Sequence, residues 1–118
     1  MLTMKKRGRE DIMVNILLVC TAGMSTSMLV KRMQEAAEAK GIEATIWAVG
    51  DANSTEESKK ADIVLLGPQV RYLKGNMEKK VEGKKPVDVI DMRVYGSMDG
   101  ESALYSALEL LENFKKEN

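Results

Sequence analysis

Short apolar runs alternate along this chain with segments whose apolar residues recur every three or four positions. Continuous apolar runs are typical of strands that are buried on both faces, as in parallel sheets. The runs predict four strands, at residues 14–20, 43–49, 63–66 and 87–90. Because helical patterns lie between them, we expect an α/β fold: a three-layer α/β/α sandwich with a four-stranded parallel sheet and right-handed crossovers.

The helices are predicted from the spacing of their apolar residues. The first begins at Met28 and ends at Gly41, and Ser54 with Glu57 has the capping-box spacing of a short helix that reaches about Lys60. One face of the next helix, which ends near Gly83, carries Val70, Leu73, Met77 and Val81. The inner face of the last helix carries Ala103, Leu104, Ala107, Leu108, Leu111 and Phe114.

The predicted sheet indicates where a functional site would lie. Parallel sheets bind ligands beyond the carboxyl ends of their strands, at the point where the strand order reverses. The loops at that edge are residues 20–27, 49–54, 67–72 and 91–100. We therefore expect the functional residues in these four loops.

The loop after the first predicted strand has the composition of an anion site. Backbone N–H groups in such a loop can surround an anion while the positive end of the following helix faces it. Glycine gives the backbone access to positive φ, and hydroxyls can cap the helix or bind phosphate. The loop consists of Cys20, Thr21, Ala22, Gly23, Met24, Ser25, Thr26 and Ser27.

Cys20 is the candidate nucleophile of this loop. A positive field that favours phosphate also favours a thiolate, so we expect the pKa of the Cys20 thiol to lie below that of an ordinary cysteine. The alternative is that Cys20 is a small core residue at the end of a buried strand. A glycine and four hydroxyls directly after the thiol exceed what a simple strand-to-helix turn requires, and they favour the phosphate or oxyanion site.

The amino-acid composition excludes or disfavours several kinds of catalytic and binding site. The chain has 118 residues, 44% of them hydrophobic, which suits one hydrophobic core. It contains no histidine and one cysteine, which excludes a Ser-His-Asp triad and a histidine-ligated or thiolate-rich metal site, and we expect no metal and no cofactor. The formal net charge of zero disfavours nucleic-acid binding. We expect a flexible tail at 1–12, a single domain at 13–118, and a cytoplasmic protein.

One substitution separates this loop from a phosphatase loop. Low-molecular-weight protein tyrosine phosphatases and their arsenate-reductase relatives place an arginine six residues after the cysteine, and here that position is Thr26. Without a guanidinium to bind the equatorial oxygens, hydrolysis should be slow. Such a loop suits a carrier that holds a phosphoryl group without losing it to water.

Three sequence blocks together resemble a known family. They are Cys20–Ser27 (CTAGMSTS), Ala61–Gln69 (ADIVLLGPQ) with Tyr72, and Pro86–Asp91 (PVDVID) with Tyr95-Gly96 and Asp99-Gly100. In this order they resemble the IIB component of the bacterial sugar phosphotransferase system, of the lactose/cellobiose type and closest to its cellobiose-like members. The likeness runs from about Val14 to the C-terminus.

The resemblance implies a function and two partners. A phosphohistidine on the IIA component would donate its phosphoryl group to Cys20, and the phosphocysteine would pass it to a cellobiose-like sugar bound by the membrane IIC component. The protein would then be cytoplasmic and transiently at the inner face of the membrane through IIC. Thr21 to Ser27 would hold the phosphoryl group chiefly through backbone N–H groups.

Four residues match the family at the possible rim of the site: Gln69, Tyr72, Asp91 and Tyr95. Purely structural roles are the alternative, since the two tyrosines could cover the core and Asp91 could cap a turn. As a function, a cysteine phosphatase or arsenate reductase is the first alternative. A nucleotide- or flavin-binding module is the second, disfavoured because no G-x-G-x-x-G follows the first strand.

Overall fold

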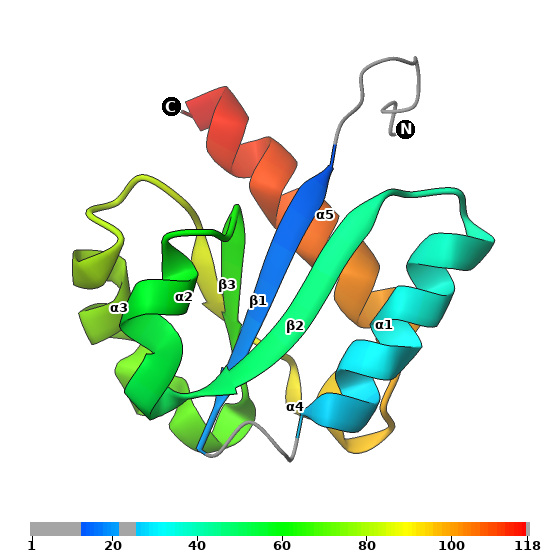
Figure 1. Ribbon diagram of the computed structural model, residues 1–118, viewed down its shortest axis with the longest axis horizontal. Helices are drawn as coiled ribbons and strands as arrows, with labels where there is room; N and C mark the ends of the chain where they lie inside the picture. The colour runs from blue at the N-terminus through cyan, green and yellow to red at the C-terminus, as the bar shows by residue number, and fades with distance from the viewer. Residues whose placement is uncertain (1–12, 22–25, 118) are drawn as a thin grey trace.

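The protein is built around one parallel sheet (Figure 1). The computed structural model describes residues 13–21 and 26–117. The strand order is β2-β1-β3-β4, and all neighbouring pairs are parallel. The order reverses next to β1, so the predicted site edge lies at the end of this strand. The strands are β1 (Val14–Cys20), β2 (Ala44–Gly50), β3 (Ile63–Leu66) and β4 (Val87–Val89).

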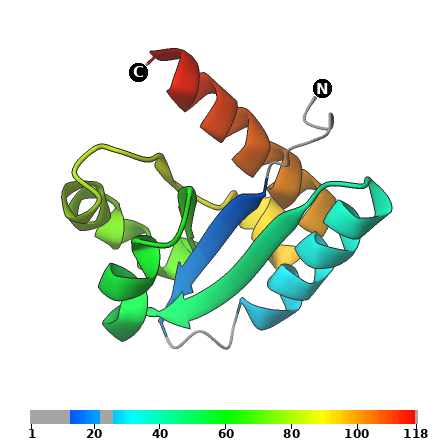
Figure 2. The same ribbon diagram turned by 45° about the horizontal axis from the view of Figure 1, so that its top comes forward.

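Helices cover both faces of the sheet and confirm the predicted three layers. Figures 1 and 2 show α1 and α5 on one face and α2 and α3 on the other. The α-helices are α1 (Ser27–Ala39), α2 (Ser54–Ser58), α3 (Lys74–Lys80), α4 (Met92–Gly96) and α5 (Gly100–Glu117), and the 3-10 helices are η2 (Asp51–Asn53) and η3 (Pro68–Leu73).

Strand β1 contributes to two hydrophobic cores. Ile16 and Leu18 belong to the core formed with α1 and α5, whereas Leu17 and Val19 belong to the core on the side of α2 and α3. All four side chains are fully buried. This alternation explains why the sequence of β1 is apolar at nearly every position.

The helix expected to carry Val70 to Val81 is interrupted. The segment starts as η3, where Val70 has a non-helical backbone (φ −117°, ψ 27°), and the regular helix α3 begins only at Lys74. Val70, Met77 and Val81 are nonetheless buried in the same core, as their spacing predicted. The pattern of burial therefore holds although the helix does not run without a break.

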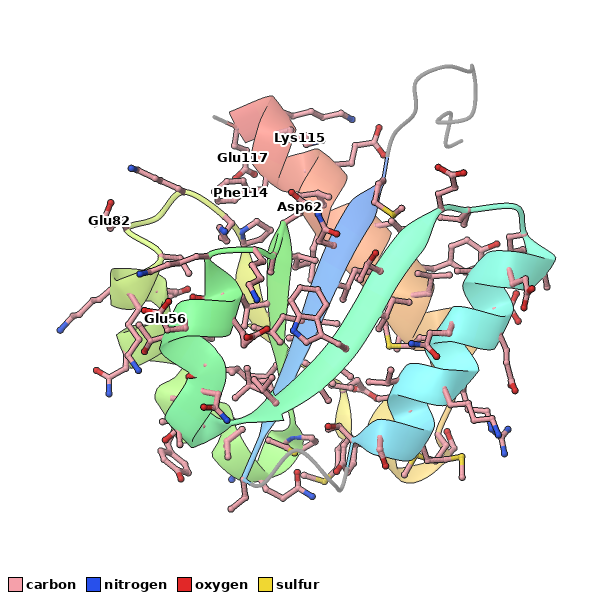
Figure 3. All side chains as sticks on the ribbon, viewed as in Figure 1. Glu56, Asp62, Glu82, Phe114, Lys115 and Glu117 are labelled. Atoms are coloured by element: carbon pink, nitrogen blue, oxygen red, sulfur yellow. The ribbon has the colours of Figure 1, made fainter. Side chains whose placement is uncertain are left out.

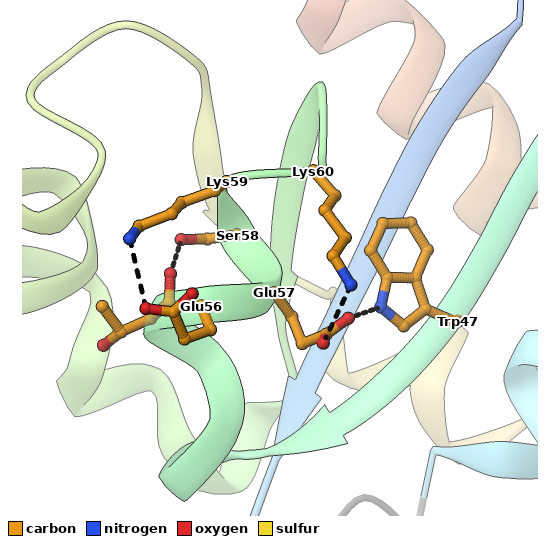
Figure 4. Close-up of polar contacts among 7 residues, drawn as sticks. Trp47, Glu56, Glu57, Ser58, Lys59 and Lys60 are labelled. Atoms are coloured by element: carbon orange, nitrogen blue, oxygen red, sulfur yellow. Dashed lines mark hydrogen bonds and ion pairs between the residues drawn. The ribbon is translucent and has the colours of Figure 1, made fainter.

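The capping box predicted for the short helix α2 does not form. Asn53 occupies the N-cap position, and the hydroxyl of Ser54 donates instead to the carbonyl oxygen of Asp51 (2.8 Å). The carboxylate of Glu57 turns to strand β2, where Oε1 accepts a hydrogen bond from Trp47 Nε1 (2.8 Å) (Figure 4). A turn of 3-10 helix precedes α2, and the N-cap of α2 is Asn53 instead of the predicted Ser54.

The contact between Trp47 and Glu57 also has an electrostatic effect. Donation from the indole N–H lowers the pKa of Glu57, and the ammonium of Lys60, 3.4 Å from Oε2, lowers it further. Trp47 is partly buried and packs against the core on the side of α2 and α3. It is therefore a packing residue with a polar partner at its indole nitrogen.

Two further interactions join α2 and β3 to the rest of the molecule. The ammonium of Lys85 donates to the carbonyl oxygens of Ser58 (2.7 Å) and Ala61, at the carboxyl-terminal end of α2. At the start of β3, Asp62 exchanges two hydrogen bonds with the backbone of Asn15 (2.8 and 2.7 Å). Figure 3 shows Asp62 at the end of the sheet opposite to the predicted site edge.

Candidate functional site

Cys20 is the last residue of β1, at the carboxyl edge of the sheet. Its neighbour in β2 is Gly50, and the preceding Val19 pairs with Leu66 of β3. The Cys20 side chain is fully buried. The sheet therefore holds the thiol in one place, at the point where the strand order reverses.

Thr26 is a polar partner of the thiol. Its hydroxyl donates a hydrogen bond to Cys20 Sγ, with 3.4 Å between Oγ1 and sulfur. Thr26 is the N-cap residue of α1, yet its side chain makes no capping hydrogen bond, and its carbonyl oxygen accepts from Val30 N (2.9 Å). A hydroxyl aimed at sulfur stabilises a thiolate, and the positive end of α1 acts in the same direction.

Gly67 brings the end of β3 against Cys20. Its N–H donates to the carbonyl oxygen of Val19 (2.8 Å). A Cβ atom at this glycine would lie 3.7 Å from Cys20 Cβ, 3.5 Å from Val19 O and 3.1 Å from Gln69 Oε1. This close approach was not predicted from the sequence, although a glycine that directly follows a buried strand is a signal for it.

The loops after β3 and β4 meet through Gln69 and Tyr95. Gln69 Nε2 donates to the hydroxyl of Tyr95, which lies on α4, at 3.4 Å. The side-chain oxygen of Gln69, Oε1, lies beside Gly67, the glycine that approaches Cys20. Two of the four predicted rim residues are thus in contact with each other at the predicted edge of the sheet.

Asp91 caps a helix, which is the structural alternative to a place at the rim of the site. Its Oδ2 accepts hydrogen bonds from the backbone N–H groups of Arg93 (3.0 Å) and Val94 (3.2 Å), so Asp91 is the N-cap of α4. The helix α4 itself was not predicted, because five residues are too few to show a helical period. A similar cap follows at Asp99, where hydrogen bonds from the N–H and hydroxyl of Ser102 lower the pKa of the carboxyl group.

The remaining predicted residues divide into three groups. Tyr72 is 74% exposed, so the suggestion that it covers the core is wrong. Thr21 and Ser27 are exposed at the two ends of the loop. Ala22, Gly23, Met24 and Ser25 lie outside the described residues.

Residues 13–21 and 26–117 contain neither a metal-binding cluster of side chains nor a membrane-spanning helix. Within these ranges, no cluster of three or more carboxylate or thiol side chains is arranged to hold a metal ion. None of the helices described there has the length and apolar character needed to cross a membrane.

Comparison with known proteins identifies the family. The family model described as PTS system, lactose/cellobiose specific IIB subunit, matches residues 15–106. This chain belongs to that family. The match contains all the strands except the first residue of β1, together with Cys20 and the three loops described above.

Individual relatives agree with the family assignment. The oligo-beta-mannoside-specific EIIB component of Bacillus subtilis (strain 168) is 48% identical over 102 residues, which is 86% of this chain and 99% of the relative. The cellobiose-specific EIIB component of Lactococcus lactis subsp. lactis (strain IL1403) is 44% identical over 102 residues, covering 81% and 94%. The solution structure of the cellobiose-specific IIB component from Borrelia burgdorferi has 42% identity and a TM-score of 0.74, covering 88% and 96%. The predicted resemblance and the α/β fold are confirmed.

Proposed function

We propose that this IIB protein is a phosphocysteine carrier in which Cys20 is the phosphorylated residue. It accepts a phosphoryl group from a phosphohistidine of the IIA component and passes it to a sugar held by the membrane IIC component. The observation that carries the proposal is the hydrogen bond from Thr26 to Cys20 Sγ, at the carboxyl edge of the sheet and at the start of α1. Because the hydroxyl donates to sulfur, it favours the thiolate form that acts as nucleophile.

The transfer conserves the phosphoryl group in two displacement steps. In the first, the Cys20 thiolate attacks phosphorus, the S–P bond forms, and the N–P bond breaks with its electron pair left on the imidazole of the donor. In the second, a sugar hydroxyl attacks phosphorus, the O–P bond forms, and the thiolate leaves. The sugar hydroxyl gives up its proton to a base as the O–P bond forms, and in this chain that base cannot be a histidine.

The loop after β1 is the proposed phosphate-binding segment. Thr21 to Ser27 would bind the phosphoryl oxygens chiefly through backbone N–H groups, assisted by the positive end of α1. Thr26 connects this loop to the thiol directly. The parts played by Ala22, Gly23, Met24 and Ser25 stay predictions.

Two features favour a carrier over a phosphatase. Thr26 stands where a phosphatase has arginine, so a fixed cation for the equatorial oxygens is absent at that position. Asp91, which follows β4, accepts two backbone hydrogen bonds through Oδ2. Asp91 Oδ2 is therefore already engaged by the backbone of α4, which leaves it poorly placed to act on a leaving group.

The sugar class follows from the relatives and not from the site. The relatives above are named for oligo-beta-mannosides and cellobiose. We propose a cellobiose-like disaccharide as the final acceptor, phosphorylated at the inner face of the membrane where IIC presents it. The carrier itself would act from the cytoplasm.

The experiment that tests this function compares wild type with Cys20→Ser. Phosphoenolpyruvate, the general phosphotransferase proteins, the cognate IIA and vesicles that contain IIC are mixed with each variant, and phosphorylation of the sugar is followed. Serine preserves the size of the buried side chain but stays protonated, so we expect an unchanged fold by circular dichroism and no sugar phosphate. Sugar phosphorylation at the wild-type rate would exclude Cys20 from the reaction.

A further inference from the structure

The glycine that opens α5 has no space for a side chain. Gly100 is buried at the start of this helix, which lies beside α1 on the same face of the sheet (Figures 1 and 2). A Cβ atom at Gly100 would lie 2.3 Å from the carbonyl carbon of Arg32 in α1, 2.5 Å from its carbonyl oxygen and 2.6 Å from its Cβ. Two of these three atoms belong to the backbone, which cannot rotate away as the end of a side chain can. The start of α5 therefore approaches the backbone of α1 more closely than any residue with a Cβ atom allows.

Contact between helices, and not backbone conformation, is the reason for a glycine at this position. Among the described glycines, positive φ occurs at Gly41 (71°) and Gly83 (66°), where a Cβ atom would meet nothing within 4 Å. Gly100 is the converse case, because its φ is not positive but its surroundings are full. An alanine at position 100 would therefore adopt the backbone without strain and would push against α1.

The start of α5 is held in place from its own side. The N–H of Asp99 donates to the carbonyl oxygen of Val94 in α4 (3.0 Å). The carboxylate of Asp99 accepts hydrogen bonds from the N–H (3.1 Å) and the hydroxyl (2.8 Å) of Ser102. In the preceding turn Met98 has a φ of 54°, which is costly for a residue other than glycine and persists where the surrounding structure imposes it. A side chain at position 100 would therefore displace α1 before it displaced α5.

Helix α1 carries this constraint to the thiol. Thr26 is joined to the helix through its carbonyl oxygen, which accepts from the N–H of Val30 (2.9 Å). Leu29 is fully buried in the core between α1, α5 and the sheet, so α1 cannot move inward. To bring a Cβ atom at Gly100 to an ordinary separation from α1, the two helices would have to part by roughly 1 Å. The hydrogen bond from Thr26 to Cys20 Sγ is already 3.4 Å long, so a shift of this size would break it.

We propose that Gly100 is a positioning residue of the Cys20 site, because its bare backbone lets α5 fix α1 where the hydroxyl of Thr26 reaches the sulfur. This inference rests on the proposed function, in which Cys20 is the nucleophile. Six positions, fewer than two helical turns, separate Arg32 from Thr26, so α1 moves as one body over this distance. Gly100 acts on the thiol through Thr26 and the amino-terminal end of α1.

The test compares Gly100→Ala with Gly75→Ala through the pH dependence of Cys20 alkylation by iodoacetamide. Gly75 is a matched control because it is also near the start of a helix, α3, and a Cβ atom there would meet nothing within 4 Å. Gly100→Ala should raise the pH midpoint of alkylation by about half a unit or more, because the hydroxyl no longer reaches the thiolate. Gly75→Ala should alkylate as wild type does. The midpoint is compared because a change in access to the thiol alters the rate at every pH and leaves the midpoint in place.

A third variant separates positioning from stability. Ala107→Gly weakens α5 at a buried position two turns further on and places no atom against α1. Its free energy of unfolding should fall, as that of Gly100→Ala should, but its alkylation midpoint should stay at the wild-type value. An equal shift of the midpoint in Ala107→Gly would overturn the inference, because any loosening of α5 would then disturb the thiol.

Two results with Gly100→Ala itself would also overturn the inference. One is an unshifted midpoint in a folded protein. The other is the loss of cooperative unfolding, because the glycine would then be required for the fold as a whole and not for the site.

A double variant tests the route through Thr26. If Gly100 acts through this residue, Gly100→Ala combined with Thr26→Val should have the same midpoint as Thr26→Val alone, because the hydroxyl is already absent. Shifts that add in the double variant would overturn the inference, since Gly100 would then affect the thiol by another path.

Phosphorylation by the donor gives a readout tied to the proposed function. The limiting rate of Cys20 phosphorylation by phosphorylated IIA should fall about threefold in Gly100→Ala, which is the change in thiolate population that half a pH unit produces. A wild-type rate in this variant would overturn the inference while the carrier function stands. If Cys20 of the wild-type protein takes up no phosphoryl group at all, the carrier function fails, and the alkylation series still decides whether Gly100 positions the thiol's partner.

Discussion

The hydroxyl of Thr26 and the sulfur of Cys20 are 3.4 Å apart and hydrogen-bonded, although six positions separate the two residues in the chain. Both side chains are fully buried. The contact joins the end of β1 to the residue that precedes α1. It gives the proposed nucleophile a donor that the sequence pattern alone did not assign.

Removing this donor should make the thiol harder to ionise. In Thr26→Val, which keeps the shape of the side chain, we expect the pH midpoint of Cys20 alkylation to rise by up to about one unit, because a hydrogen bond to the thiolate is lost. Iodoacetamide alkylation rates between pH 5 and pH 10 measure this directly.

Thr26→Ser provides the control, because serine retains the hydroxyl. Its alkylation midpoint should stay close to that of wild type. If Thr26→Val and Thr26→Ser both alkylate as wild type does, the hydrogen bond has no part in activating Cys20.

Hydrolysis of aryl phosphates should be negligible in the native protein. Thr26 replaces the arginine of phosphatase loops, so charge on the equatorial oxygens is poorly stabilised, and Asp91 Oδ2 is already engaged by two backbone N–H groups of α4. Thr26→Arg should raise hydrolysis somewhat and shorten the lifetime of the phosphocysteine. Release of p-nitrophenol by wild type on the order of 1 s⁻¹, a usual enzyme rate, would favour the phosphatase alternative.

The fold was predictable because its signals are local. The strand Ile63–Leu66 has its predicted bounds, since Asp62 and Gly67-Pro68 delimit a short apolar run. The five-residue helix α4 was missed because it is shorter than two helical turns and depends on the side chain of Asp91. The capping box at Ser54 was wrong because Asn53 takes the N-cap position after a turn of 3-10 helix, and Glu57 accepts instead from Trp47, which lies on another element.

The sequence predicted which loops form the candidate site but not how closely those loops approach one another. The loops at the carboxyl edge were placed by the parallel topology, and Gln69 and Tyr95 do meet there. The approach of Gly67 to Cys20 depends on the register of β1 and β3, which apolar runs do not specify. The segment that carries Tyr72 is the 3-10 helix η3, with a non-helical backbone at Val70, which helical spacing did not reveal.

Lys85 should contribute measurably to stability. Its ammonium binds the carbonyl oxygens of Ser58 and Ala61, so Lys85→Met should lower the free energy of unfolding by about 1–2 kcal/mol. The matched control is Lys84→Met, because Lys84 is exposed and its ion pair is with the exposed Glu82 (3.2 Å). Urea unfolding should give a change within about 0.5 kcal/mol for the control. Equal effects of the two substitutions would show that the contacts of Lys85 add nothing.

The contact between Trp47 and Glu57 should make stability depend on pH. Because the folded state lowers the pKa of Glu57, its contribution is complete above the unfolded pKa and is lost as the pH falls through the lower folded value. The stability advantage of wild type over Glu57→Gln should therefore shrink below about pH 4. Trp47 is the single tryptophan, so its fluorescence during urea unfolding reports both variants. A difference that stays constant from pH 7 to pH 3 would contradict this assignment.

The most direct measurement for the carrier function is the position of the phosphoryl group. Wild-type protein is incubated with phosphoenolpyruvate, the general phosphotransferase proteins and the cognate IIA, digested under conditions that preserve S–P bonds, and mapped by tandem mass spectrometry. We predict one phosphoryl group, on Cys20, which disappears when IIC and its sugar are added. A phosphoryl group on any other residue, or none on Cys20 while sugar phosphate still forms, would contradict the account.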